Sequence, residues 1–173
     1  MMKTLEQLCR ETDVEKWVQP SFIEGYAAHL HESGTIAATS GCFDILHAGH
    51  VRFLRRAAQL ATHLIVCINS DDSVRRLKGV SRPIVSLVDR IVMLNELQAV
   101  SDIIVFREDT PVDLISILKP NIWVKGGDYQ HKELAERATV EKYGGVVRIL
   151  PYVPGHSTTA LWGRLDGSTE EHE

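Results

Sequence analysis

The sequence predicts an α/β domain, with a doubly wound parallel sheet of five strands and helices on both faces. Short apolar runs alternate with segments whose apolar residues recur at helical spacing, the order expected of strand–helix–strand units. The run over 63–68 is continuously apolar, as in a strand buried on both faces of a parallel sheet. Polar residues of the types that bind ligands or take part in catalysis follow directly after such runs, at the strand ends where Rossmann-like sheets bind ligands.

Each element has its own signal in the sequence. Asp71 lies in a polar group that can cap a short helix, Pro111 suits a first helical position, and Gly144 ends a helix. Apolar runs predict strands over 36–38, 63–68, 103–106, 122–124 and 146–150. Helical periodicity predicts helices over 3–18, 21–30, 50–60, 71–77, 86–100, 110–118, 132–143 and 157–162.

Three parts can be distinguished along the chain. Residues 1–34 are expected to form a helical appendage, in which Pro20 ends the first helix and Ser21 can cap the second. Its simplest role is packing. The alternative is a contact with a partner or a second copy, and we expect a homodimer. Residues 35–163 form the main domain, and residues 164–173 form a polar, acidic tail that we expect to be mobile.

Composition limits the classes of function. The 173 residues are 44% hydrophobic and 24% charged, which suits one domain with a proper core. The net charge of −4 argues against a general nucleic-acid-binding surface. No apolar run reaches the roughly 18 residues of a membrane helix. The 3 cysteines are far apart and the N-terminus has no apolar signal core, so we expect a reduced, cytoplasmic protein that binds neither nucleic acid nor membranes.

The chain is organised around the stretch 39–50, which reads TSGCFDILHAGH. It follows a predicted strand and leads into a predicted helix. The free N–H groups and positive dipole end of such a helix start form a site for phosphate. His47 and His50 lie at that start, and Gly49 leaves room for a flat ring near the backbone. A metal site is the alternative for this pair, but no third ligand stands nearby in the sequence, so we expect no protein-bound metal.

The segment HAGH at 47–50 resembles the HxGH signature of the nucleotidyltransferase superfamily. The longer block 41–50 resembles its cytidylyltransferase-like branch, and is most similar to the adenylyltransferase part of the ADP-heptose synthases. Further segments also match that family, so that the resemblance extends from residue 36 to residue 161. They are NSD at 69–71, RLKG at 76–79, DR at 89–90, KGGDY at 125–129 and STT at 157–159.

The resemblance implies a reaction and a set of residues. In these enzymes a sugar phosphate attacks the α-phosphorus of a nucleoside triphosphate that carries Mg²⁺, and pyrophosphate leaves. The implied catalytic residues are His47, His50 and Lys78, the last on a flexible loop that closes on the phosphates. The implied substrate-binding residues are Ser40, Asn69 and Arg90. The implied nucleotide-binding residues are Cys42, Phe43, Asp44, Gly49, Lys125, Gly126, Gly127, Asp128, Ser157, Thr158 and Thr159.

The leading hypothesis is therefore a D-glycero-β-D-manno-heptose 1-phosphate adenylyltransferase, which makes ADP-heptose for lipopolysaccharide synthesis. Two features differ from the family pattern. Ser40 stands where the heptose enzymes often carry Asn, and 151–156 lacks an arginine found in some cytidylyltransferases. The alternatives are a CTP- or GTP-dependent enzyme acting on a substrate such as glycerol 3-phosphate, and a non-catalytic nucleotide-binding subunit. Bifunctional relatives also carry a sugar kinase, which we expect here on a separate protein.

Overall fold

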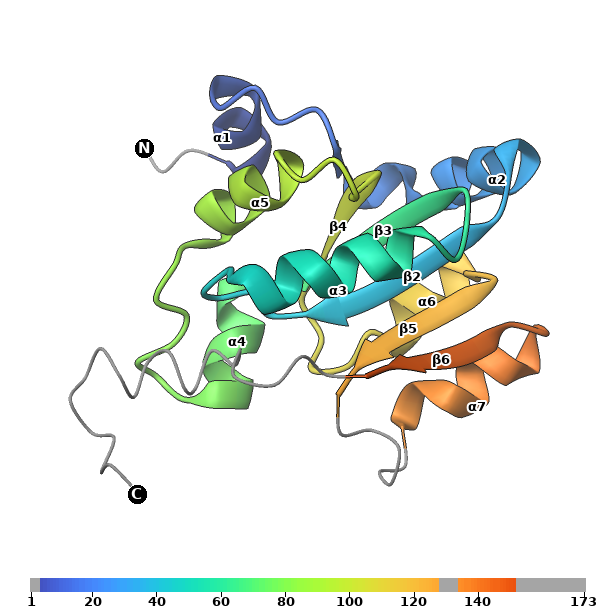
Figure 1. The fold of residues 1–173 in the computed structure, drawn as a ribbon. Helices are drawn as coiled ribbons and strands as arrows, with labels where there is room; N and C mark the ends of the chain where they lie inside the picture. Colours follow the sequence, from blue (N-terminus) through green and yellow to red (C-terminus); the bar gives the residue numbers. More distant parts are fainter. Residues whose placement is uncertain (1–3, 128–133, 152–173) are drawn as a thin grey trace, which may run out of the picture.

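The structure, a computed structural model, describes residues 4–127 and 134–151. Within these residues, the centre of the molecule is a fully parallel, six-stranded sheet in the order β1-β4-β3-β2-β5-β6 (Figure 1). The strands are β1 (Trp17–Val18), β2 (Ile36–Gly41), β3 (His63–Asn69), β4 (Asp102–Phe106), β5 (Ile122–Gly126) and β6 (Val146–Leu150).

The order of the strands reverses at β2. From this strand the chain passes to β3 on one side, where Ile36 pairs with His63. It later returns to β5 on the other side, where Ala37 pairs with Ile122. In doubly wound sheets, ligands bind in the crevice outside the carboxyl ends of the strands at such a reversal. The turn after β2 and the end of β5 therefore frame the expected site.

Helices cover both faces of the sheet, so the expected α/β architecture is confirmed. One face packs against α1 (Leu5–Glu11), α3 (Ala48–Ala58) and α5 (Leu87–Asn95), and the other against α2 (Ile23–Ser33), α6 (Val112–Leu118) and α7 (Ala135–Lys142) (Figure 1).

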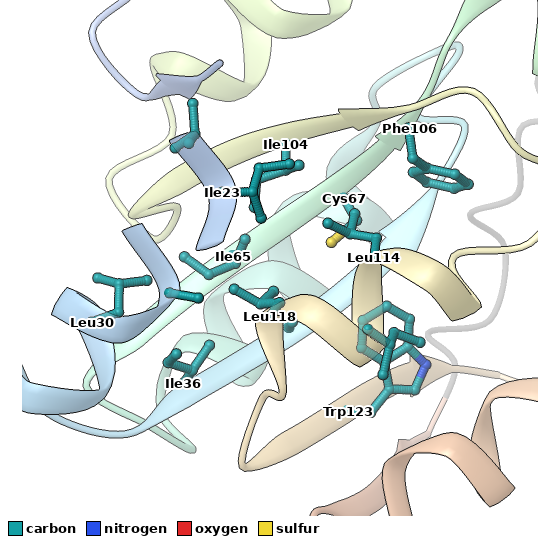
Figure 2. Packing of buried hydrophobic residues seen from close by; sticks show 14 of the residues in the cluster. Ile23, Leu30, Ile36, Ile65, Cys67, Ile104, Phe106, Leu114, Leu118 and Trp123 are labelled. Atoms are coloured by element: carbon teal, nitrogen blue, oxygen red, sulfur yellow. The ribbon is translucent and has the colours of Figure 1, made fainter. Parts of the chain in front are cut away.

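Each strand contributes alternate residues to two separate cores, because successive side chains point to opposite faces. On β3, Leu64 and Val66 pack toward α3 and α5. Ile65 and Cys67 pack toward α2 and α6, in the core that Figure 2 shows. Trp123 of β5 is fully buried in this second core. β3 is therefore buried on both faces, as its continuous apolar sequence predicts.

The sixth strand corrects the expectation of five. The sequence predicts one helix over 3–18, but α1 ends at Glu11 and residues 17–18 run parallel to β4. Asp13 has a φ of 52°, a left-handed conformation that a right-handed helix cannot include. Trp17 and Val18 still bury apolar surface, one in each core. Their spacing therefore fits a helix although the backbone is extended.

The helices among the described residues otherwise differ from expectation mainly at their ends. α2 begins after a 3₁₀ turn (η1, Pro20–Phe22), so Ser21 lies inside that turn and does not cap the helix. α4 (Asp71–Lys78) is capped within the polar group around Asp71, as expected: the side chain of Ser70 accepts a hydrogen bond from the N–H of Ser73. The helix expected over 157–162 lies outside the described residues. None of the described helices has the length and apolarity that crossing a membrane requires.

Candidate active site

The turn between β2 and α3 places both histidines at one helix start. His47 is the N-cap of α3, and its Nδ1 accepts a hydrogen bond of 3.4 Å from the N–H of His50. The two imidazole rings stack with their centroids 3.9 Å apart and an interplanar angle of 26°. Gly49 occupies the first turn of the helix between them. The structure thus brings the predicted pair together beside the positive end of the helix dipole.

The surroundings of His50 keep it neutral at physiological pH. Burial lowers its pKa to about 4, and electrostatic interactions with His47 and Lys78 act in the same direction. A backbone hydrogen bond with Ile45 acts in the opposite direction but is outweighed. The ring of Phe43 lies against it, with centroids 5.2 Å apart. In the free protein His50 is therefore an uncharged hydrogen-bond donor or acceptor rather than a fixed cation.

Protonation of His50 is expected to weaken the fold at acidic pH. Its pKa falls from the ordinary histidine value of 6.5 to about 4 in the folded protein, so between these two pH values the unfolded chain binds the proton more readily. The free energy of unfolding should therefore fall as the pH drops from about 6.5 to about 4, with no contribution from this residue at higher pH. Urea unfolding at about pH 7 and about pH 5 should show a smaller loss of stability for His50→Gln than for the wild type.

His29, which is exposed on α2, provides the matched control for this experiment. His29→Gln should lose as much stability between the two pH values as the wild type. Equal losses in the wild type and His50→Gln would show that His50 is not held neutral by the fold.

Phe43 lies in the core beneath the turn rather than on its surface. It is 6% exposed and joins the cluster that includes α3 and α5. Its φ of 48° is unusual for a bulky residue. A Cβ on Gly41 would lie 3.1 Å from the Phe43 ring, so the glycine at the end of β2 lets the ring fold back under the turn. The ring of Phe43, a predicted nucleotide-binding residue, therefore packs against His50.

Asp44 is directed into the protein. Its side chain is fully buried, and Oδ1 accepts hydrogen bonds from the N–H groups of Ile84 at 2.7 Å and Val85 at 3.0 Å. Oδ2 lies 2.7 Å from Nη1 of Arg82 in an ion pair. The carboxylate of Asp44, a residue that the resemblance assigns to nucleotide binding, thus contacts the loop that follows α4.

Lys78 lies at the last turn of α4 and is exposed. The helix ends at Gly79, whose φ of 99° favours glycine and whose surroundings are open. Because the charge of Lys78 lowers the pKa values of both His50 and Cys42, its ammonium group acts on the histidine turn. Lys78 is thus the last residue of a helix, and the loop that follows it is anchored at Arg82 by the ion pair with Asp44.

Arg90, predicted to bind substrate, is fully buried in α5. Its Nη1 donates to the carbonyl oxygens of Cys42 at 2.5 Å and Asn69 at 3.0 Å, and its Nε donates to that of Val85 at 3.1 Å. Nη2 lies 2.6 Å from Oδ1 of Asp71 at the start of α4. The guanidinium group therefore makes four contacts with protein acceptors and holds together the ends of β2 and β3 and the starts of α4 and α5.

Asn69 and Cys42 face each other across the ends of β3 and β2. The Sγ of Cys42 lies 3.8 Å from Oδ1 of Asn69, and Nδ2 of Asn69 donates to Oγ of Ser73 at 2.9 Å. Burial raises the pKa of the Cys42 thiol, although the charges of Lys78 and Arg90 act against it. The net direction makes Cys42 a neutral thiol that packs beside the turn.

Lys125 bridges strands and a helix at the other side of the reversal. Its Nζ donates to Oγ of Ser40 at 2.9 Å and lies 2.8 Å from Oε1 of Glu136, which is buried on α7. The ammonium also lies 5.5 Å from the centre of the Trp123 ring. The predicted nucleotide-binding Lys125 and the predicted substrate-binding Ser40 thus contact each other, and Glu136 is a member of the site that sequence reasoning missed.

The glycines at the end of β5 allow close approach of the chain. A Cβ on Gly126 would lie 3.2 Å from the ring of Phe53 on α3, so only a glycine lets this strand end meet the helix without displacement. Gly127 has a φ of 81°, and its N–H donates to the carbonyl oxygen of Leu150 at 3.0 Å. Four predicted residues, Asp128, Ser157, Thr158 and Thr159, lie outside the described residues.

A cavity at the opposite ends of the strands is separate from this site. Asn121 and Gly145 line it and directly precede β5 and β6, so it opens at the amino ends of the strands. His31, Lys119 and Tyr143 complete most of its wall. Burial raises the pKa of Tyr143 to about 12, so its phenol is neutral. Its position excludes this cavity from the chemistry of the histidine turn.

The chain is similar to known proteins along most of its length. Residues 38–161 match the family model described as cytidylyltransferase-like. The bifunctional protein HldE of Streptomyces coelicolor is 50% identical over 133 residues, which is 77% of this chain and 29% of that protein. HldE of Nitratiruptor sp. is 44% identical over 162 residues, which is 92% of this chain and 34% of that protein. The chain therefore spans about a third of the length of these relatives.

Solved structures share the fold. A lipopolysaccharide core biosynthesis protein from Thermoplasma volcanium has a TM-score of 0.58 and 28% identity, covering 69% of this chain and 97% of its own. A pantoate–β-alanine ligase from Francisella tularensis, in complex with β,γ-ATP and β-alanine, has a TM-score of 0.58 and 15% identity, covering 78% of this chain and 66% of its own, and shows the fold alone. Since the family model spans most of the chain and the sheet is doubly wound as expected, this protein belongs to the cytidylyltransferase-like family.

Proposed function

We propose that this protein transfers a nucleotidyl group from a nucleoside triphosphate to a sugar 1-phosphate and releases pyrophosphate. The observation that carries the proposal is the stacked pair His47 and His50 at the start of α3, on the reversal point of a doubly wound sheet. The charge of Lys78 also reaches this pair, since it lowers the pKa of His50. A helix start, two imidazoles and an ammonium group together form a site for a strongly anionic ligand.

The proposed chemistry needs positioning and charge stabilisation rather than a base. The attacking sugar phosphate is already ionised, so no proton has to be removed before its oxygen forms a bond to the α-phosphorus. As that bond forms, the bond to the leaving pyrophosphate breaks, and negative charge grows on the oxygens around both. His47 and His50 are hydrogen-bond donors for the α-phosphate oxygens, and Lys78 compensates the charge of the leaving group. Donors fixed by stacking and capping need no reorganisation during the reaction.

The substrates that we propose are ATP and D-glycero-β-D-manno-heptose 1-phosphate, giving ADP-heptose and pyrophosphate. The support is the match of the blocks at 41–50 and 69–71 to the adenylyltransferase part of ADP-heptose synthases. The chain is 44–50% identical to bifunctional HldE proteins and spans about a third of their length. This partial coverage agrees with a chain that carries one of the two activities of a bifunctional protein. The likeness to a lipopolysaccharide core biosynthesis protein agrees with the same role.

Mg²⁺ enters this proposal with the triphosphate as part of the substrate. In the described parts of the chain, no three or more His, Cys, Asp or Glu side chains are arranged to hold a metal ion. The carboxylates of Asp44 and Asp71 are directed to Arg82 and Arg90. Mg²⁺ retains several water ligands and binds phosphate oxygens readily. A homodimer, a cytoplasmic location and the absence of nucleic-acid and membrane partners stay predictions.

Pyrophosphate release from a panel of nucleoside triphosphates and sugar phosphates tests the proposal. ATP with the heptose 1-phosphate should be the best pair, with kcat/KM at least about tenfold above CTP, which requires only roughly 1.4 kcal/mol of differential transition-state binding. A preparation of the double variant His47→Ala/His50→Ala serves as the blank. Better turnover with CTP or GTP, or with glycerol 3-phosphate, would replace the substrate assignment. No turnover with any pair would favour a non-catalytic nucleotide-binding subunit.

A further inference from the structure

The segment that carries Lys78 is fastened at its beginning by Arg90. This buried guanidinium group lies 2.6 Å from the carboxylate of Asp71, the first residue of α4. The same group donates to the carbonyl oxygens of Cys42 and Asn69, at the ends of β2 and β3. The start of α4 is therefore tied to the strand ends on which the histidine turn is built.

The same segment is fastened at its other end by Asp44. This carboxylate belongs to the histidine turn itself, yet all of its described contacts are with the loop after α4, through Arg82 and the N–H groups of Ile84 and Val85. The N–H of Arg82 also donates to the carbonyl oxygen of Gly79 at 3.1 Å, directly after Lys78. Between the two anchors the tip of the loop is open, since Val80 is 95% exposed.

From these contacts we propose that Asp44 is a positioning residue, which holds the Lys78 segment against the histidine turn so that one triphosphate can be bound by both. This proposal rests on the proposed function. A bare carboxylate at this place would repel a triphosphate. Its charge is compensated by Arg82, and the two N–H donors satisfy its remaining oxygen, the condition under which a buried ion pair is tolerated. Asp44 therefore affects phosphate binding through Lys78 and not by direct contact.

A double-mutant cycle separates this role from a merely structural one. The variants are Asp44→Asn, which keeps the shape of the side chain, Lys78→Ala, and the two combined. Binding of MgATP, MgCTP and MgGTP is measured by calorimetry without any sugar phosphate. Each single change should weaken binding of the preferred triphosphate roughly tenfold, and the double variant should bind within about twofold of Lys78→Ala alone, because residues that act through one contact are not additive. Multiplying effects would overturn the proposal.

Two further variants keep the cycle interpretable. Asp72→Asn removes the same charge from an exposed position on α4, where Asp72 pairs with Arg75, and should leave triphosphate binding unchanged. A matching loss in Asp72→Asn would show that the effect does not depend on the contacts of Asp44 with Arg82, Ile84 and Val85, and would overturn the proposal. If Asp44→Asn does not fold, Asp44→Ser takes its place in the cycle, because this smaller neutral side chain also removes the ion pair with Arg82 and leaves no bare carboxylate.

The NMR titration of His50 provides a readout that needs no nucleotide. Loss of the positive charge in Lys78→Ala should raise the pKa of His50, because that charge lowers it. Asp44→Asn should raise this pKa in the same direction, whereas the direct effect of removing a negative charge would be to lower it. A fall or no change in Asp44→Asn would overturn the positioning role. Absence of triphosphate binding to the wild type would overturn the proposed function, and the titration would still decide whether Asp44 positions Lys78.

Discussion

Replacing either His47 or His50 with alanine is expected to lower kcat for nucleotidyl transfer by roughly 10²–10³, the usual effect of removing one preorganised donor from a developing negative charge. The KM for the triphosphate should change less, since neutral donors contribute most where charge develops. Pyrophosphate release under saturating substrates measures the effect. The two rings stack at 3.9 Å, so we also expect the double variant to lose less than the product of the two single effects.

His29→Ala is the control for these variants, because His29 is exposed on α2. Its kcat should equal that of the wild type. Circular dichroism and urea unfolding at neutral pH should show that the alanine variants at 47 and 50 remain folded. A folded His50→Ala protein that turned over at the wild-type rate would contradict the role assigned to this residue.

Replacing Arg90 with methionine is expected to lower the free energy of unfolding by about 3–5 kcal/mol, the range for breaking a buried charged network from one side. The change would leave the carbonyl oxygens of Cys42, Asn69 and Val85 without their donor, and the carboxylate of Asp71 without its ion pair. Unsatisfied buried acceptors are costly because they lose their hydrogen bonds to water on folding. The denaturant midpoint in urea measures the effect.

Arg75→Met is the matched control for this substitution. Arg75 pairs with Asp72 on the surface of α4, where both side chains are largely exposed. Such surface ion pairs contribute only about 0–1 kcal/mol. Equal losses in the free energy of unfolding would mean that the buried contacts of Arg90 stabilise the protein no more than a surface ion pair does.

The α/β architecture could be predicted because apolar runs of β3 and β4 are buried on both faces and leave an unambiguous pattern. The strand at Trp17 could not, because two residues are too short to show a period of two, and their apolar side chains also fit helical spacing. The false cap at Ser21 has a similar cause: a capping residue type occurs two residues before α2 begins, within η1. Local preference places an element but does not fix its first residue.

The histidine turn could be predicted because its chemistry lies within one short stretch of sequence. The orientation of charged side chains around it could not. Asp44 and Arg90 belong to the matching segments, but their partners are 40 and 48 residues away in the chain, at Ile84 and Cys42. Only the packed structure shows that these two charges face the protein. The sequence did not indicate that Glu136 belongs to the site, because a glutamate in a helix with many charged residues is expected to be exposed to solvent.

The short strand β1 has a consequence for how the protein behaves in concentrated solution. The outermost strand of a sheet presents unpaired N–H and C=O groups on which a strand of another molecule can assemble. In this protein the edge strand on this side of the sheet is β1, which consists of only Trp17 and Val18. Without them the border would be β4, whose Ile103 and Ile104 are fully buried in the intact protein. We therefore expect a chain shortened past Val18 to keep both histidines of the site yet to self-associate, which light scattering would measure.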